Sequence, residues 1–170
     1  ETFEECAVGE TGMLATGGHL PRGYYKDTEK TARTFIETPA GRYVIPGDFA
    51  ILEEDGTITL LGRGSVCINT GGEKVFPEEV EEGIKAHPSV SDAIVVGVAD
   101  EQWGQRVTSL VTVRVGYDFD EQALIDHTRT KVAGYKTPKQ FFKIDEMPRH
   151  PTGKPDYTTA QKLAAQLAGQ

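Results

Sequence analysis

A lysine near the end of the chain, Lys154, follows a glycine in the segment Pro148-Arg149-His150-Pro151-Thr152-Gly153-Lys154-Pro155. The prolines on both sides and the glycine predict an exposed, bendable loop. A compact ammonium group on a long stem suits phosphate and carboxylate oxygens, so this loop could bring a cation to an anionic reaction centre. Most loop lysines are solvated surface charges, however, and the motif needs support from other residues.

A carboxylate, Asp48, ends the segment Tyr43-Val44-Ile45-Pro46-Gly47-Asp48. An ionised carboxylate only accepts hydrogen bonds, and its two oxygens can take both hydroxyls of a ribose diol. A Gly-Asp pair is most often part of an ordinary turn, and that alternative stays open from these residues alone.

Glycines mark two further segments. Gly71 and Gly72 lie in Asn69-Thr70-Gly71-Gly72-Glu73-Lys74-Val75-Phe76-Pro77-Glu78-Glu79-Val80-Glu81. Paired glycines let the backbone approach a ligand closely, whereas the plainer alternative is a loop that enters a helix. Arg63 stands between two glycines in the segment 61–65. This segment could be a hinge, and an ordinary β-turn is an equal alternative.

The elements that must position these residues differ between the two halves. Residues 1–62 contain brief apolar stretches bounded by Gly and Pro, with an Asp-Gly pair at 55–56 that favours a tight hairpin turn, and residues 26–35 predict one short helix. Residues 63–170 show a pattern of alternating strands and helices. Strands are expected at 93–98, 107–115 and 140–144, and the continuous apolar character of 93–98 predicts a strand buried on both faces. Helices are expected from Pro77 to before Pro88, near 120–132 and at 156–167.

The composition excludes several classes of protein. The chain has 170 residues, a hydrophobic share of 38% and a formal charge of −8, which does not supply the clustered Lys and Arg that nonspecific nucleic-acid binding requires. We expect neither a transmembrane segment nor a signal peptide, and a cytoplasmic location by default. Cys6 and Cys67 are expected to be reduced thiols, and no residue spacing predicts a metal held by this chain. The opening Glu1-Thr2-Phe3-Glu4-Glu5, without an initiator methionine, suggests a piece of a longer protein.

In order and spacing these segments resemble the adenylate-forming superfamily of acyl-CoA synthetases, luciferases and nonribosomal adenylation domains. There, a Tyr-x-x-Gly-Asp-like segment closes the large domain and a Gly-Arg pair opens the hinge. A Gly-Gly loop leads into a Pro-Glu-Glu-Val-Glu-like helix, and a Pro-x-x-x-x-Gly-Lys segment ends the small domain. The segment 69–81 looks most like actinobacterial fatty-acid and steroid side-chain acyl-CoA ligases. The resemblance covers nearly the whole chain.

The resemblance implies an α+β fold in two parts. Residues 1–62 would be the carboxy-terminal end of the large AMP-binding domain, from its β-barrel subdomain. Residues 63–170 would be the small, mobile α/β lid domain, with a three-stranded sheet and helices. An upstream large domain would hold the Mg²⁺ ligands and the acyl pocket.

The resemblance also implies a two-step reaction. A carboxylate attacks the α-phosphorus of Mg-ATP to give an acyl-adenylate and pyrophosphate, and the thiol of coenzyme A then displaces AMP. Lys154 would bridge the two anions of the first step, which neutralises their repulsion, while Asp48 and Arg63 would hold the ribose. Gly71 and Gly72, followed by Lys74, would serve the pantetheine arm. The acid would be a fatty or steroid side-chain carboxylic acid.

The sequence also departs from the family pattern. Ser65 stands where relatives commonly carry Asp or Lys at the hinge, Pro46 replaces a threonine, and Asn69 replaces a lysine. There is no Ser/Thr/Gly-rich phosphate loop and no Tyr-Gly-x-Thr-Glu-like segment, so we expect the chain alone to be inactive in adenylation. The rival interpretations are a non-catalytic α/β module that binds a protein and a sensor that binds AMP or coenzyme A.

Overall fold

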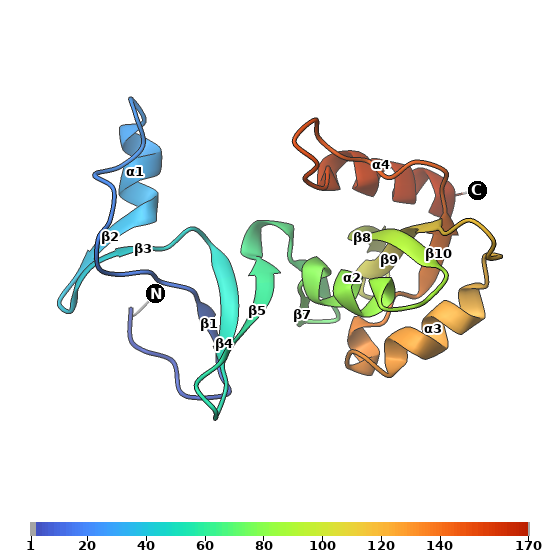
Figure 1. Cartoon of the computed structure of the whole chain (residues 1–170), viewed down its shortest axis with the longest axis horizontal. Helices are drawn as coiled ribbons and strands as arrows, with labels where there is room; N and C mark the ends of the chain where they lie inside the picture. Colours follow the sequence, from blue (N-terminus) through green and yellow to red (C-terminus); the bar gives the residue numbers. More distant parts are fainter. Residues whose placement is uncertain (1–2, 170) are drawn as a thin grey trace. The chain divides into compact units, whose positions relative to one another are not determined.

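The chain divides into two compact units, Glu1–Ser65 and Val66–Gln170. The computed structural model describes residues 3–169 (Figure 1). Residues 1 and 2 of the opening segment therefore lie outside the described residues, as does Gln170.

The first unit is built from two small antiparallel sheets and one helix. Strands β1 (Thr11–Met13), β4 (Asp48–Leu52) and β5 (Ile58–Arg63) form a three-stranded sheet in the order β1-β4-β5, and β2 (Phe35–Thr38) pairs with β3 (Gly41–Val44). Helix α1 spans Thr28–Thr34, which confirms the short helix expected there. It begins at Asp27, whose side chain accepts a hydrogen bond from the backbone of Lys30 over 2.9 Å.

The β4–β5 hairpin turns at the Asp55-Gly56 pair, as the sequence predicts. Gly56 has a φ of +82°, which favours glycine, and the Asp55 carboxylate accepts the backbone N–H of Thr57 over 2.9 Å. Few apolar side chains of this unit are buried: Ala50 and Leu61 are, whereas Ile58 and Leu60 are 58% and 60% exposed. The first unit therefore has only a small core of its own.

The second unit is a five-stranded sheet with helices on both faces. Its strands are β6 (Ile68–Thr70), β7 (Glu73–Val75), β8 (Val90–Asp100), β9 (Gly104–Val113) and β10 (Gln140–Lys143). The three strands predicted from the sequence are β8, β9 and β10. The sheet has five strands rather than three because the segment around Gly71 and Gly72 folds into the β6–β7 hairpin.

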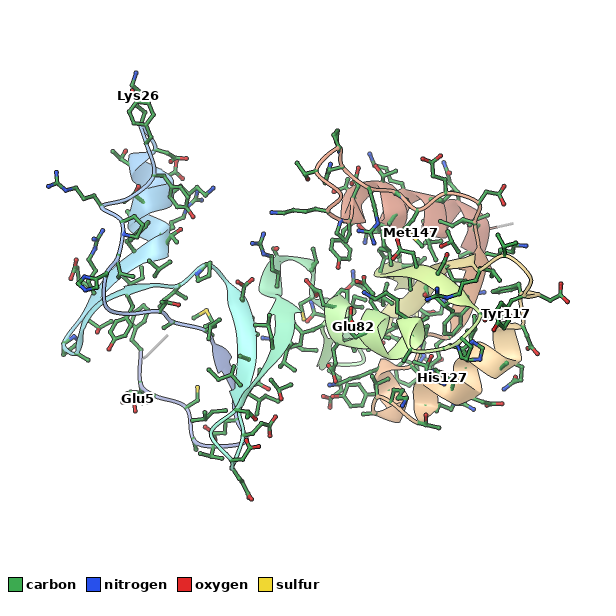
Figure 2. The ribbon with its side chains drawn as sticks, in the orientation of Figure 1. Glu5, Lys26, Glu82, Tyr117, His127 and Met147 are labelled. Atoms are coloured by element: carbon green, nitrogen blue, oxygen red, sulfur yellow. The ribbon has the colours of Figure 1, made fainter. Side chains whose placement is uncertain are left out.

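The helices of the second unit cover the sheet on both faces. Helices α2 (Pro77–Lys85) and α3 (Glu121–Arg129) pack on one cluster of buried side chains, and α4 (Tyr157–Ala168) packs on another that includes Met147, which is labelled in Figure 2. Alternate residues of β8 enter the two clusters, so this strand is buried on both faces, as its continuous apolar character predicts. The α+β class is confirmed.

Two short 3₁₀ segments, Gly64–Val66 and Gly134–Lys136, complete the described elements. The first contains Ser65 and lies where the two compact units meet in the sequence. No helix between residues 3 and 169 combines the length and apolar character that a membrane crossing needs.

Candidate functional site

Asp48 and Arg63 face each other across two strands of the first unit. Asp48 is the first residue of β4 and Arg63 the last residue of β5, and the two residues are direct partners in the antiparallel register. Arg63 Nε donates a hydrogen bond to Asp48 Oδ1 over 3.2 Å. Both side chains are solvent-accessible, with 25% of Asp48 and 61% of Arg63 exposed. An exposed carboxylate and guanidinium at one end of a sheet can bind hydroxyl groups together.

Gly47, directly before β4, and Gly64, directly after β5, contact each other beside this pair. Gly47 has a φ of +90°, and its carbonyl accepts the backbone N–H of Gly64 over 3.0 Å. A Cβ atom at Gly64 would lie 2.6 Å from the ring of Phe49, which is too close for any other residue without movement of the ring. Gly64, beside Arg63, therefore has a local structural reason that is independent of a hinge.

The segment with Gly71 and Gly72 is a two-residue hairpin turn. Their φ angles are +60° and +89°, and Thr70 pairs with Glu73 across the turn. Positive φ at both central positions is typical of a type I′ turn, which explains the glycine pair in terms of backbone conformation. Lys74 follows on β7, opposite Asn69 on β6, and is exposed.

The hairpin is held against the β8–β9 turn. The backbone N–H of Gly71 donates to the carbonyl of Trp103 over 2.9 Å, and Asn69 donates to the side chain of Gln105 over 2.8 Å. A Cβ atom at Gly71 would lie 2.8 Å from the indole of Trp103, whose side chain is 46% exposed. Gly71 is therefore in close contact with an accessible aromatic ring.

Lys154 lies at the exposed end of the loop that precedes α4. Among residues 3–169, no side chain makes a hydrogen bond or an ion pair with its ammonium group. The prediction of exposure is confirmed. An exposed ammonium group without a bound partner can bind an anionic ligand.

Backbone hydrogen bonds close this loop, and its bendability stays a prediction. The carbonyl of Lys154 accepts the N–H of His150 over 2.9 Å, and the carbonyl of His150 accepts the N–H of Gly153 over 2.8 Å. At its base, the N–H of Asp156 donates to the carbonyl of Pro148 over 3.0 Å. The prolines and the glycine thus form a small closed turn.

Both ends of this turn are attached to the second unit. Before it, Arg149 forms an ion pair with Asp92 of β8, with a shortest distance of 2.7 Å. After it, Asp156 caps α4 by accepting the N–H of Thr159 over 3.0 Å. Lys154 is therefore fixed to the body of the unit on either side.

Glu81 of α2 has a buried carboxyl group that contacts β8 and α4. It is only 4% exposed and accepts hydrogen bonds from the backbone of Val95 over 2.9 Å and from the hydroxyl of Tyr157 over 3.3 Å. Burial raises the pKa of the Glu81 carboxyl to about 7, although both hydrogen bonds act in the opposite direction. No local pattern indicates this burial, because Glu81 stands among exposed and half-buried glutamates in the acidic start of α2.

The predicted site residues fall on both units. Asp48 and Arg63 are brought together in the first, while Gly71, Gly72, Lys74 and Lys154 belong to the second. Within the second unit the two loops lie at opposite ends of β8. Asp92, which holds the lysine loop, is near its start, and Asp100 at its end pairs with Gly104 beside the glycine hairpin. Residues 92 to 100 of a strand span roughly 26 Å.

Sequence reasoning missed the residues that hold the lysine loop. Arg149 was part of the motif but had no role assigned, and Asp92 carried no signal of its own. Over the described range 3–169, no three His, Cys, Asp or Glu side chains gather as a metal site would require.

Residues 79–154, from α2 to the lysine loop, match the family AMP-binding enzyme C-terminal domain. This stretch of the chain is therefore similar to that family. The match begins inside α2, covers β8 to β10 and α3, and ends at Lys154.

The curated relatives that match the chain include CoA ligases. The chain is similar to 3-oxocholest-4-en-26-oate–CoA ligase of Rhodococcus rhodochrous, with 54% identity over 157 residues, 92% of this chain and 28% of that protein. It is 52% identical over 155 residues to a medium/long-chain-fatty-acid–CoA/3-oxocholest-4-en-26-oate–CoA ligase of Mycolicibacterium smegmatis, covering 91% of this chain and 28% of that one. The resemblance to actinobacterial acyl-CoA ligases is confirmed.

A solved structure shares the fold. o-Succinylbenzoate CoA synthetase from Bacillus subtilis, in complex with its acyl-adenylate intermediate, superposes with a TM-score of 0.83 at 27% identity. The match covers 92% of this chain and 31% of that one. The chain therefore spans less than a third of the length of each of these three proteins.

Proposed function

We propose that the chain is the carboxy-terminal part of an ATP-dependent acyl-CoA ligase, which converts a carboxylic acid, ATP and coenzyme A into acyl-CoA, AMP and pyrophosphate. The observation that carries this proposal is the 54% identity to a CoA ligase over 92% of the chain. The names of the two relatives support a fatty acid or a steroid side-chain acid as the substrate class. The cytoplasmic location stays a prediction.

Lys154 is the catalytic residue of the adenylation step in this proposal. Two anions, the carboxylate and the α-phosphate, must meet, and a cation between them stabilises the charge that develops in the transition state. The ammonium is exposed and has no partner within residues 3–169, so it needs no rearrangement to bind oxygen atoms. The closed turn holds the backbone of Lys154 in a defined position on the unit.

Asp48 and Arg63 hold the ribose of ATP in this proposal. The carboxylate accepts hydrogen bonds from the two hydroxyls, and the guanidinium, already in contact with the carboxylate, donates to the same group. A preformed pair lowers the ordering that binding requires, because neither side chain has to find the other when the nucleotide arrives.

The glycine hairpin serves the thioester step. Gly71 and Gly72 expose backbone that a pantetheine arm can approach closely, and Lys74 adds a cation for the phosphates of coenzyme A. The hairpin and the lysine loop are attached at opposite ends of β8, so one fixed orientation of the unit does not bring both to the same reacting group. The two steps therefore require the second unit to turn, with residues 61–65 as the hinge.

In this proposal, residues outside this chain bind the magnesium ion. The described residues offer no grouped carboxylates that could hold it, and the carboxylate of Asp48 is already paired with Arg63. Bound Mg²⁺ would neutralise phosphate charge and orient the leaving pyrophosphate.

The direct test is the exchange of pyrophosphate into ATP by the complete protein with octanoate as the acid. Lys154→Ala should lower this exchange about 100-fold or more, because the cation acts only in the transition state. Lys162→Ala, which removes an exposed lysine of α4, is the matched control. Full exchange by the Lys154 variant would overturn the assignment.

The rival functions are tested on residues 1–170 alone and on the complete protein. Without the phosphate-binding segments, we expect no pyrophosphate release from ATP and a fatty acid by residues 1–170 alone, and weak ATP binding at best in calorimetry. Tight binding of AMP or coenzyme A by this chain would favour a sensor. Unchanged turnover of the Lys154 variant in the complete protein would favour a non-catalytic module that binds a protein.

A further inference from the structure

Arg149 connects the lysine loop to the sheet through all three of its side-chain nitrogen atoms. Its Nε and Nη2 donate to the carboxylate of Asp92 over distances between 2.7 and 2.9 Å. Its Nη1 donates to the carbonyl of Gly153 over 2.6 Å. One guanidinium therefore joins β8 to the peptide bond that directly precedes Lys154.

This contact orients a specific peptide plane. Gly153 has a φ of +81°, so its carbonyl direction is set by a backbone conformation that few other residues adopt. The carbonyl belongs to the planar peptide unit between Gly153 and Lys154, and fixing its direction fixes the position of the Cα atom from which the Lys154 side chain leaves the backbone. A rigid, planar guanidinium is well suited to hold two groups at a set angle.

The ion pair with Asp92 anchors the guanidinium itself. Asp92 belongs to β8, the strand that is buried on both faces, so the carboxylate is on a rigid element. The pair is bidentate, and 35% of the Arg149 side chain is exposed. Because the same guanidinium also holds the Gly153 carbonyl, the pair links the orientation of the loop to β8.

We propose that Arg149, held by Asp92, is a positioning residue for the adenylation step, which keeps the Lys154 loop in the orientation that this step requires. The inference rests on the proposed function, because it assigns Arg149 a role in the same reaction. Arg149 does not touch the reacting atoms; it acts through the Gly153 carbonyl on Lys154.

The structural half of the proposal can be tested on the chain without any activity. In hydrogen exchange, the amides of His150, Gly153 and Asp156 are protected by the bonds that close the turn. Arg149→Gln and Asp92→Ala should each raise exchange in residues 150–156 about tenfold, with β8 and β9 unchanged. Arg129→Gln, which removes an exposed arginine paired with Asp126 on α3, is the matched control. Unaltered exchange in residues 150–156 would overturn the proposal.

The functional half uses two half-reactions of the complete protein. Pyrophosphate exchange reports adenylation, and AMP release from a preformed octanoyl-adenylate with coenzyme A reports the thioester step. Arg149→Gln should lower kcat of exchange between about 10-fold and 100-fold with little change in the KM for ATP, and leave the thioester step within about twofold. Arg149→Lys should recover part of the loss. Equal losses in both steps would indicate a general folding defect and would overturn the positioning role.

The two proposals fail in different ways. If Lys154→Ala leaves pyrophosphate exchange intact, the proposed function fails whatever Arg149 does. If Lys154→Ala abolishes exchange while Arg149→Gln and Asp92→Ala do not lower it, the function stands and the positioning role is wrong. In the double variant Arg149→Gln/Asp92→Ala, the loss should be about that of either single variant, because both act through one contact.

Discussion

Tyr157, the first residue of α4, donates a hydrogen bond from its hydroxyl to the buried carboxyl of Glu81 on α2, over 3.3 Å. Two helices that cover opposite faces of the sheet are thus joined at a titratable group. The contact lies three positions after Lys154 in the sequence and helps to fix the start of α4.

The buried carboxyl predicts a pH-dependent stability of the second unit. The folded pKa of Glu81 is about 7 against a reference value of 4.5, so the proton is bound more tightly in the folded state. The stabilisation from this group is fully present below pH 4.5 and is lost as the pH rises through 7. Over that window the loss should be roughly 3 kcal/mol.

The variant Glu81→Gln should remove this dependence. Urea unfolding followed by circular dichroism at pH 4.5 and pH 8 should show the free-energy gap between native chain and variant changing by roughly 3 kcal/mol, in favour of the native chain at low pH. Glu82→Gln removes an exposed carboxylate from the same helix and is the control. A gap that does not change with pH would contradict the prediction.

The pair of Asp48 and Arg63 predicts a specific defect in nucleotide binding. In the complete protein, Arg63→Gln should raise the KM for ATP about tenfold, since one charged hydrogen-bond partner is removed. Asp48→Ala should have at least this effect. Arg33→Gln, on the exposed face of α1, is the control. Initial rates at varied ATP concentrations measure the KM for ATP. Unchanged KM values in both site variants would argue against ribose binding by this pair.

The glycine hairpin predicts unequal effects of two alanine substitutions. Gly71→Ala places a Cβ atom 2.8 Å from the Trp103 ring in addition to the strain of positive φ, whereas Gly72→Ala meets no atom within 4 Å. Gly72→Ala should therefore cost about 1 kcal/mol and Gly71→Ala more. The difference should shrink in Gly71→Ala/Trp103→Leu, because the contact with the ring is relieved. Thermal unfolding measures these stabilities, and equal losses in both single variants would exclude the close contact.

The small core of the first unit predicts where proteases cut first. Ile58 and Leu60 on β5 are exposed, while the second unit buries two clusters. Limited proteolysis of the isolated chain by subtilisin should therefore cleave within residues 3–65 before the rest and leave a fragment that starts near residue 66. Survival of the first unit while the second is degraded would contradict this order.

Local signals explain which parts of the fold the sequence could predict. Pro77 marks the first position of α2, and Asp156 and Asp120 cap the helices that follow them, because these side chains act on neighbouring backbone. The continuous apolar run at 93–98 correctly predicted a strand buried on both faces. The β6–β7 hairpin was missed although a Gly-Gly pair between short alternating segments is a hairpin signal.

The features that the sequence did not predict depend on contacts between residues that are distant in the chain. Asp92 and Arg149 are 57 positions apart, and nothing near either one indicates the other. Glu81 is buried because β8 and α4 cover it, whereas the neighbouring Glu82 is exposed. The closure of the lysine loop by hydrogen bonds could not be predicted from the sequence either, since prolines and a glycine occur in both closed turns and flexible linkers.

The β8–β9 ladder joins the lysine loop at one end to the glycine hairpin at the other. Its length therefore sets the separation of the two loops, and each residue pair added to it would displace one loop from the other by roughly 3.4 Å. Insertions during evolution should for that reason accumulate in connections such as residues 114–119, which lie outside the ladder and carry neither loop.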